Sequence, residues 1–358
     1  MHSCRFITTH PERSRPSLKA ASVCYPEISD SPRIAPVIKM LECSEVNSKT
    51  TSDFPYSFTE DGRLCHVDTL KPYKFSFQLK DVQATMREHT SLCCYISQHV
   101  YNLLEKKYNL IKVYLDKGSH SDSHPPGFVY MSPGALGHNG TLMVLIQDKG
   151  TIRCGTWSWR AVVHEGLETG SQIPYVHRAL EESCAVLLMN PNEGAVTPEE
   201  HVHQVWDQML LNSTAEQIVV VAHGYGGLAF VHLLCCRMKE IQQRKCAAAF
   251  IDSSHNLWHQ PLGALGRDWI KTHSSTWVLS SKPTNRLVGS LKAGCRMISA
   301  GTLCHETAPA ACMESVFRYF AKLTKHAVAP TPFGIVTRSR SLSTRKPSST
   351  SDQDNTTS

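Results

Sequence analysis

Short apolar runs alternate with amphipathic segments along most of this chain. Runs of strand length occur at residues 110–115, 128–131, 142–146, 185–189, 218–222, 247–251, 277–279 and 297–298. Helical patterns separate most of the later runs. Continuous apolar strands joined by helices are typical of an α/β fold, in which helices cover both faces of a mostly parallel sheet. A site in such a fold forms outside the carboxyl ends of the strands, so the residues that follow each strand are the candidates for chemistry.

An N-terminal extension precedes this alternation. Residues 54–58 and 64–67 are short apolar runs on either side of Asp61-Gly62, and an Asp-Gly step in that setting predicts a hairpin. A long amphipathic helix is then predicted over residues 81–106, because apolar side chains recur there at helical spacing: Leu92, Ile96, Val100, Leu103 and Leu104. Further along, Thr197-Pro198 provides a cap residue and a proline at the first position of another helix.

The chain is expected to hold one globular unit between two tails. Residues 53–326 carry the periodic patterns, whereas residues 1–52 and 327–358 are rich in Ser, Thr, Pro and Arg. We predict that both tails are disordered, since neither can bury enough apolar surface to offset its conformational entropy. Part of the net charge of +6 lies in these tails. Their basic runs fit contact with nucleic acid or an import receptor, and they fit plain solubility as well.

Cysteine usage and the start of the chain indicate a compartment. The chain has 14 cysteines, among them the adjacent pairs Cys93–Cys94 and Cys235–Cys236 inside helical patterns. Residues 1–22 are polar and contain no secretory signal. We therefore expect reduced thiols and a cytosolic or nuclear protein. Since no stretch approaches the roughly 18–20 continuous apolar residues that cross a bilayer, no membrane contact is expected.

The strongest chemical signal is a turn between a strand and a helix. The strand at residues 217–222 runs into His223-Gly224-Tyr225-Gly226-Gly227, and a helical pattern follows at residues 228–239. This is the setting of the G-x-S-x-G nucleophile elbow of the α/β-hydrolase fold. Its central position is Gly224, which tolerates the strained backbone of the turn but lacks the nucleophilic hydroxyl. A phosphate-binding loop is the competing reading, but no Lys-Ser/Thr follows the glycines and no acid stands at a ribose-binding distance.

The other catalytic positions can be sought by chain order. Asp252 ends the next strand and is the best acid, although a strand-end cap would explain it equally well. His305 follows the last strand, where the catalytic histidine of this fold stands. Gln147-Asp148 occupies the oxyanion segment, and Asp148 would place a negative charge where catalysis needs a positive one. We therefore interpret Gly224, Asp252 and His305 as a vestigial triad and predict no hydrolase activity.

Two alternatives to this interpretation remain at this stage. A hydrolase could use Ser253, Ser254 or Cys304, although none of them lies on an elbow. A small-molecule sensor could use the old substrate pocket, whose rim we expect to include His223, Tyr225, His255 and His259. A zinc site is not expected, because His201-Val-His203 has no evident third ligand and no C-x₂₋₄-C pair has a matching second pair. No metal or other cofactor is predicted.

Three segments of the chain carry a family resemblance: residues 223–230, 252–260 and 299–306. They resemble the argonaute-binding-protein-two family and its vertebrate branch, "family with sequence similarity 172", most closely the B-type group. The likeness spans about residues 53–325 and implies an α/β-hydrolase-like domain.

This chain departs from the A-type group at the catalytic positions. The A-type group has a serine where this chain has Gly224, and it has His-Gly where this chain has Gln147-Asp148. The A-type group also has a charged insertion before the helix at residues 197–211, where this chain is much shorter, so any partner binding or nuclear targeting by that insertion is in doubt here. The resemblance implies a link to Argonaute proteins, small-RNA-directed silencing, heterochromatin and cotranscriptional regulation of alternative splicing. Together with the missing elbow hydroxyl, it leads us to expect a non-catalytic scaffold or adaptor in the nucleus, and also in the cytoplasm. Its expected partners are Argonaute-type, chromatin or splicing proteins, with RNA as an indirect partner.

Overall fold

The computed structural model describes residues 54–74, 81–116, 126–193, 196–257, 259–289 and 295–326. The predicted tails, residues 1–52 and 327–358, lie outside the described residues.

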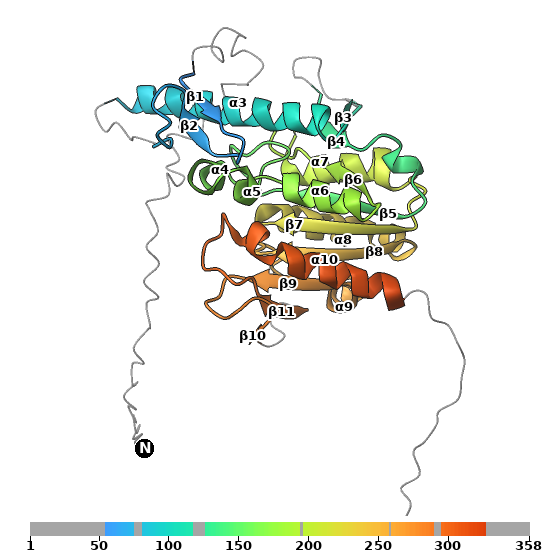
Figure 1. Ribbon diagram of the computed structural model, residues 1–358. Helices are drawn as coiled ribbons and strands as arrows, with labels where there is room; N and C mark the ends of the chain where they lie inside the picture. The colour runs from blue at the N-terminus through green and yellow to red at the C-terminus, as the bar shows by residue number, and fades with distance from the viewer. Residues whose placement is uncertain are drawn as a thin grey trace, which may run out of the picture.

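A nine-stranded sheet forms the centre of the molecule (Figure 1), in the order β10-β11-β9-β8-β7-β5-β6-β4-β3. Its strands are β3 (Ile111–Tyr114), β4 (Phe128–Met131), β5 (Thr141–Ile146), β6 (Ala185–Leu188), β7 (Gln217–His223), β8 (Lys245–Ile251), β9 (Ser274–Val278), β10 (Leu287–Gly289) and β11 (Arg296–Ser299). Six neighbouring strands in the middle of the sheet, β11, β9, β8, β7, β5 and β6, pair in parallel, and the antiparallel pairings lie at the two edges: β10 with β11, β6 with β4, and β4 with β3. The predicted mostly parallel α/β sheet is therefore confirmed.

Helices cover both faces of this sheet, as the continuous apolar strands require. Successive residues of one strand point to opposite faces: on β5, Met143 and Leu145 contact one core, and Leu142, Val144 and Ile146 contact the other. The first core is closed by α3 (Val82–Lys106), α4 (Trp159–Glu165), α5 (Leu167–Gly170), α6 (Ile173–Glu181) and α10 (Ala308–His326). The second core is closed by α7 (Pro198–Val205), the π-helical turn η2 (Trp206–Leu210), α8 (Tyr225–Gln242) and α9 (Ala264–His273). A short 3₁₀ turn, η1 (Ala135–Gly137), precedes β5.

The N-terminal extension is a hairpin followed by a long helix, as the sequence predicts. Strands β1 (Tyr56–Phe58) and β2 (Leu64–His66) pair antiparallel across the Asp61-Gly62 turn. Helix α3 begins where Asp81 accepts a hydrogen bond from the N–H of Ala84, and its buried face packs on the first core. The extension therefore adds to one face of the sheet.

The start of α7 is fixed by a reciprocal cap. The Thr197 hydroxyl accepts the N–H of Glu200 at 3.2 Å, and the Glu200 carboxylate accepts the N–H of Thr197 at 2.8 Å. Proline follows at the first helical position, where no N–H is needed.

The expectation that every thiol is reduced was wrong. Cys94 is disulfide-bonded, whereas ten other described cysteines are free. The adjacent Cys93 is one of these free thiols, so the vicinal pair is not bonded to itself. A helical pattern identifies the face on which a cysteine lies but not which distant thiol will reach it.

Within the described ranges, no helix is long and apolar enough to cross a membrane.

Candidate functional site

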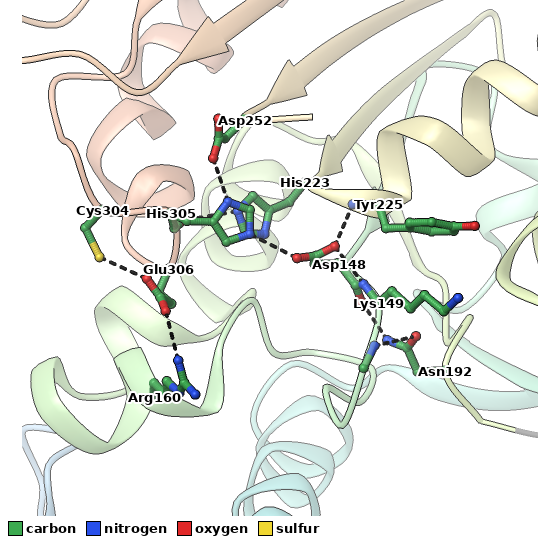
Figure 2. A network of polar contacts seen from close by, with 11 residues as sticks. Asp148, Lys149, Arg160, Asn192, His223, Tyr225, Asp252, Cys304, His305 and Glu306 are labelled. Atoms are coloured by element: carbon green, nitrogen blue, oxygen red, sulfur yellow. Dashed lines mark hydrogen bonds and ion pairs between the residues drawn. The ribbon is translucent and has the colours of Figure 1, made fainter. Parts of the chain in front are cut away.

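Four segments meet at the carboxyl edge of the sheet (Figure 2). Asp148 follows β5, Gly224 follows β7, Asp252 follows β8, and His305 follows β11. These strands are parallel, so their carboxyl ends share one edge and bring together residues that are up to 157 positions apart. The structure thus places the three predicted triad positions and the oxyanion segment side by side.

The elbow keeps the backbone of a nucleophile turn. Gly224 has φ +53°, a left-handed conformation that favours glycine, and its N–H bonds the carbonyl of Ile251 at 3.1 Å. A Cβ at Gly226 would lie 2.6 Å from the carbonyl oxygen of Gln147, so only glycine lets α8 approach β5 this closely. Strand, turn and helix therefore form the elbow geometry without its hydroxyl.

The side chain of Asp148 fills the space that a nucleophile would need. A Cβ built on Gly224 would lie 2.3 Å from the Asp148 Cγ and 2.4 and 2.6 Å from its two carboxylate oxygens. One of those oxygens, Oδ1, accepts the backbone N–H of Tyr225 at 2.6 Å and that of Lys149 at 2.8 Å. The N–H that follows the nucleophile is one of the two oxyanion-hole donors in this fold. In this chain a fixed carboxylate already occupies that donor.

His305 lies between two carboxylates (Figure 2). Its Nδ1 contacts Oδ2 of Asp252 at 2.7 Å, and its Nε2 contacts Oδ2 of Asp148 at 3.0 Å. Burial opposes protonation of the ring, but hydrogen bonds to Asp148 and Asp252 outweigh it and raise the pKa of His305 to about 10. Both ring nitrogens then carry protons, and both donate to carboxylates. An imidazolium with no free lone pair cannot serve as a general base near neutral pH.

The same contacts hold Asp148 ionised. Burial would raise the pKa of Asp148, yet the hydrogen bonds from His305 and from the N–H of Tyr225 outweigh it and lower that pKa below its usual range. Asn192 fixes the segment from the other side, because its amide donates to the backbone carbonyl of Asp148 at 2.6 Å. Asn192 carries no sequence signal that would have identified it.

His223 packs beneath this network as a neutral ring. It is fully buried, stacks on His305 with ring centroids 4.2 Å apart, and its Nε2 donates to the His305 carbonyl at 3.1 Å. Burial first, and the charge on His305 second, lower the pKa of His223 to about 4. The stacked neutral imidazole supports the charged one and fixes its backbone.

Asp252 does more than cap its strand. Its φ of +38° is rare for a non-glycine residue, and its N–H bonds the carbonyl of Trp277 at 2.7 Å. This conformation turns the carboxylate toward His305. No acid follows β9 in the sequence, and Asp252 provides the carboxylate from the neighbouring strand β8.

The predicted rim is only partly assembled. The Tyr225 hydroxyl donates to Glu199 at 2.6 Å and lies on a groove of about 700 Å³ between Lys149 and α7. His305 is not among the residues that line this groove. His255 turns toward Ser253, with Nδ1 2.7 Å from its Oγ, and His259 is exposed. In the described part of the chain, His305 contacts Asp252, Asp148 and His223, and not His255 or His259.

Two further groups complete the surroundings. Cys304 donates through its thiol to Glu306 at 3.2 Å, and Arg160 pairs with the same carboxylate at 3.6 Å (Figure 2). Gln147 is completely buried, and its side-chain amide has no hydrogen-bond partner among the described residues. Its burial removes it from any role as a surface contact.

Comparisons with known proteins establish the family of this chain. Residues 47–196 and 193–284 match the Arb2 domain family. The chain belongs to this family. It is 32% identical over 347 residues to the cotranscriptional regulator ARB2A homolog of Gallus gallus, a match that covers 79% of this chain and 83% of that protein. It is 32% identical over 330 residues to the putative protein ARB2BP of Homo sapiens, covering 78% of this chain and 90% of that protein.

Among solved structures, a histone deacetylase from Saccharomyces cerevisiae aligns with a TM-score of 0.46 and 15% identity, over 64% of this chain and 97% of that one. The family resemblance stated from the sequence is confirmed.

Proposed function

We propose that this protein is a non-catalytic Arb2-domain adaptor of the nucleus that takes part in cotranscriptional regulation. Its relatives carry the name cotranscriptional regulator, which supports the setting. In this proposal its partners are chromatin, splicing or Argonaute-type proteins. The α/β-hydrolase-like domain then serves as a rigid body whose surface binds, and its old catalytic edge has become a structural element.

The position of the Asp148 carboxylate carries the non-catalytic part of the proposal. This carboxylate fills the space where the nucleophile would lie. It also accepts the N–H of Tyr225, which would serve as an oxyanion donor, and it binds Nε2 of His305. Acyl transfer needs all three of these to be free for the nucleophile and the substrate. Substitution of Gly224 alone would leave two of them blocked.

Labelling and turnover with matched variants test this proposal. Purified full-length protein, G224S, and the D148A/G224S double variant are treated with a fluorophosphonate probe and with short acyl esters. We expect no labelling of the wild-type protein or G224S. The double variant gains labelling at residue 224, because it restores a hydroxyl beside His305 and Asp252. Ester turnover by the wild-type protein that H305A abolishes would overturn the proposal.

The adaptor role is tested by affinity purification from nuclear extract, with and without nuclease. Proteins that remain bound after nuclease treatment support direct protein contacts. Recovery that disappears with nuclease would show that nucleic acid mediates the contact, and failure to enrich any nuclear protein would contradict the adaptor role.

A residual esterase is the second candidate, and one contact favours it. The Ser253 hydroxyl lies 2.7 Å from Nδ1 of His255, a nucleophile–base distance. Burial lowers the pKa of His255 to about 4, so its ring is neutral. However, Ser253 Oγ also lies 3.4 Å from the N–H of His255 and would sit 1.9 Å from a Cβ on Gly227, as expected of a turn-forming serine packed against α8. Stoichiometric probe labelling that S253A removes would establish the esterase and reject the adaptor-only proposal.

A further inference from the structure

A cluster of soft ligands lies between α7 and α8, away from the His305 network. It consists of His203 on α7 and His232 and Cys236 on α8. One ligand atom from each of these three residues lies within 4.8 Å of the other two. His232 and Cys236 are four residues apart, so one face of α8 presents both side chains toward α7.

We propose that His203, His232 and Cys236 form a Zn²⁺ site with one open coordination position. The site is independent of the proposed adaptor function, because no member of the cluster contacts Asp148, Asp252 or His305 in the described structure.

The distance between the two imidazoles fits a shared metal. Nε2 of His203 lies 3.2 Å from Nδ1 of His232. Two nitrogen ligands at about 2.0–2.1 Å from a tetrahedral zinc ion lie about 3.3 Å apart. The ring planes meet at 76°, so the two imidazoles approach edge-on and do not stack. Zinc would displace the single proton that these facing nitrogens can share.

The third ligand selects the class of metal. Cys236 is exposed, so its thiolate can turn toward the imidazoles without displacing core side chains. Imidazole and thiolate together favour zinc over magnesium or calcium, which take oxygen ligands. With one thiolate and two neutral imidazoles, a bound Zn²⁺ would keep a net charge of +1. Acidic side chains that could balance this charge line the same groove: Glu199, Glu200 and Asp207.

The open position faces that groove. His203 and His232 both line the groove of about 700 Å³, together with Tyr225 and Gln204. The nearby Asp207 is held by Arg237 at 2.8 Å, so it remains outside the ligand set. Three protein ligands and a water in the fourth position form the arrangement of zinc sites that remain accessible to a further ligand.

Helix α7, which carries His203, is firmly placed. The reciprocal cap at Thr197 fixes the first turn of α7, and the buried Val202 and Val205 hold its inner face against the second core. His201 is not a ligand: it points into the protein, where its Nε2 accepts the N–H of Asn190 at 3.0 Å. His203, two positions on, therefore points outward.

Zinc and cobalt titration of the full-length protein tests the site. Protein without an affinity tag is treated with a chelator and desalted without reductant, so that the disulfide of Cys94 stays intact, and Zn²⁺ is then added while thermal unfolding is followed. Co²⁺ is added in parallel, because a bound thiolate gives a charge-transfer absorption band. We expect one equivalent to bind, to raise the unfolding temperature and, for cobalt, to give the thiolate band.

Matched variants locate the binding. C236S should remove the cobalt band, and H232A should weaken zinc binding by more than the roughly 10–100-fold that loss of an outer-sphere partner costs. C235S is the control, because it removes the adjacent half-buried thiol on the same helix and should bind as the wild-type protein does. Far-ultraviolet circular dichroism shows whether each variant is folded. Absence of binding, or equal binding by the wild-type protein, H232A and C236S, overturns the proposal.

Discussion

Alanine at Gly224 should destabilise the protein through two separable effects. Gly224 has φ +53° and ψ −122°, and a non-glycine residue held in such a sparsely populated conformation costs about 1–3 kcal/mol. The new Cβ would also lie 2.3 Å from Cγ of Asp148 and displace its carboxylate. The hydrogen bonds from Tyr225 N–H and His305 would then be lost, at about 1.5–3 kcal/mol for each charge-assisted bond. The Asp148 side chain is 24% exposed, so we take the lower end, about 1.5 kcal/mol for each bond, and expect a total of about 4–6 kcal/mol.

Urea unfolding of four variants separates the two effects. G134A is the control for a positive φ, because Gly134 is left-handed at φ +70° and ψ +13° with nothing within 4 Å of a built Cβ, so it should cost only about 1–2 kcal/mol. D148A and D148A/G224A complete a double-mutant cycle, because D148A removes all three atoms nearest the new Cβ. The cycle should give a coupling of about 3 kcal/mol, which is the loss of the two hydrogen bonds to Asp148. Equal losses for G224A and G134A, or strict additivity of D148A and G224A, would refute the claim that Asp148 fills the nucleophile position.

Three other changes are expected to be measurable by urea unfolding. The pKa of His305 is raised to about 10, above its unfolded value near 6.5, so its stabilisation is complete below about pH 6.5 and is lost as the pH rises toward 10. Because the His305 side chain is 34% exposed, we expect the free energy of unfolding to fall by only about 1–3 kcal/mol over this pH range. D252N should make the free energy of unfolding depend less on pH, and an unchanged dependence contradicts the ion pairing. T197A should cost about 1 kcal/mol by removing the cap of α7, whereas T197S, which keeps the hydroxyl, should cost little. Y175F should cost about 1 kcal/mol, because the buried hydroxyl donates to the Pro309 carbonyl at 2.8 Å and joins α6 to α10; a neutral result would mean that water replaces the bond.

Much of the fold follows from local patterns. The predicted helix over residues 81–106 corresponds to α3, Val82–Lys106, and the apolar run at residues 128–131 is β4 without a change of bounds. These elements are long or continuous enough for their periodicity to be unambiguous. The edge strand β10 and the short helices α4 and α5 carried weaker signals. Gly166, with φ +95°, separates those two helices, and a four-residue helix such as α5 has too few positions to show a period.

The candidate site was only partly predictable. Chain order identified Gly224, Asp252 and His305, because the elbow and the strand ends have fixed places in an α/β-hydrolase-like sheet. It did not show that Asp148 reaches into the empty elbow, because the length of a side chain and the path of a loop are not local properties. His203 and His232 were missed as a pair for the same reason: they are 29 residues apart and meet only when α7 packs against α8.

The sequence by itself determined the α/β class, the order of the strands along the chain, the loss of the elbow hydroxyl at Gly224 and the family. Each of these depends on residue types at fixed local spacing, which the chain carries in any conformation. Only the tertiary structure decided that the Asp148 carboxylate replaces the missing side chain and that His305 is held as an imidazolium between two acids. Those properties depend on distances between separate strand ends and on burial, which raises or lowers a pKa only after the chain has folded.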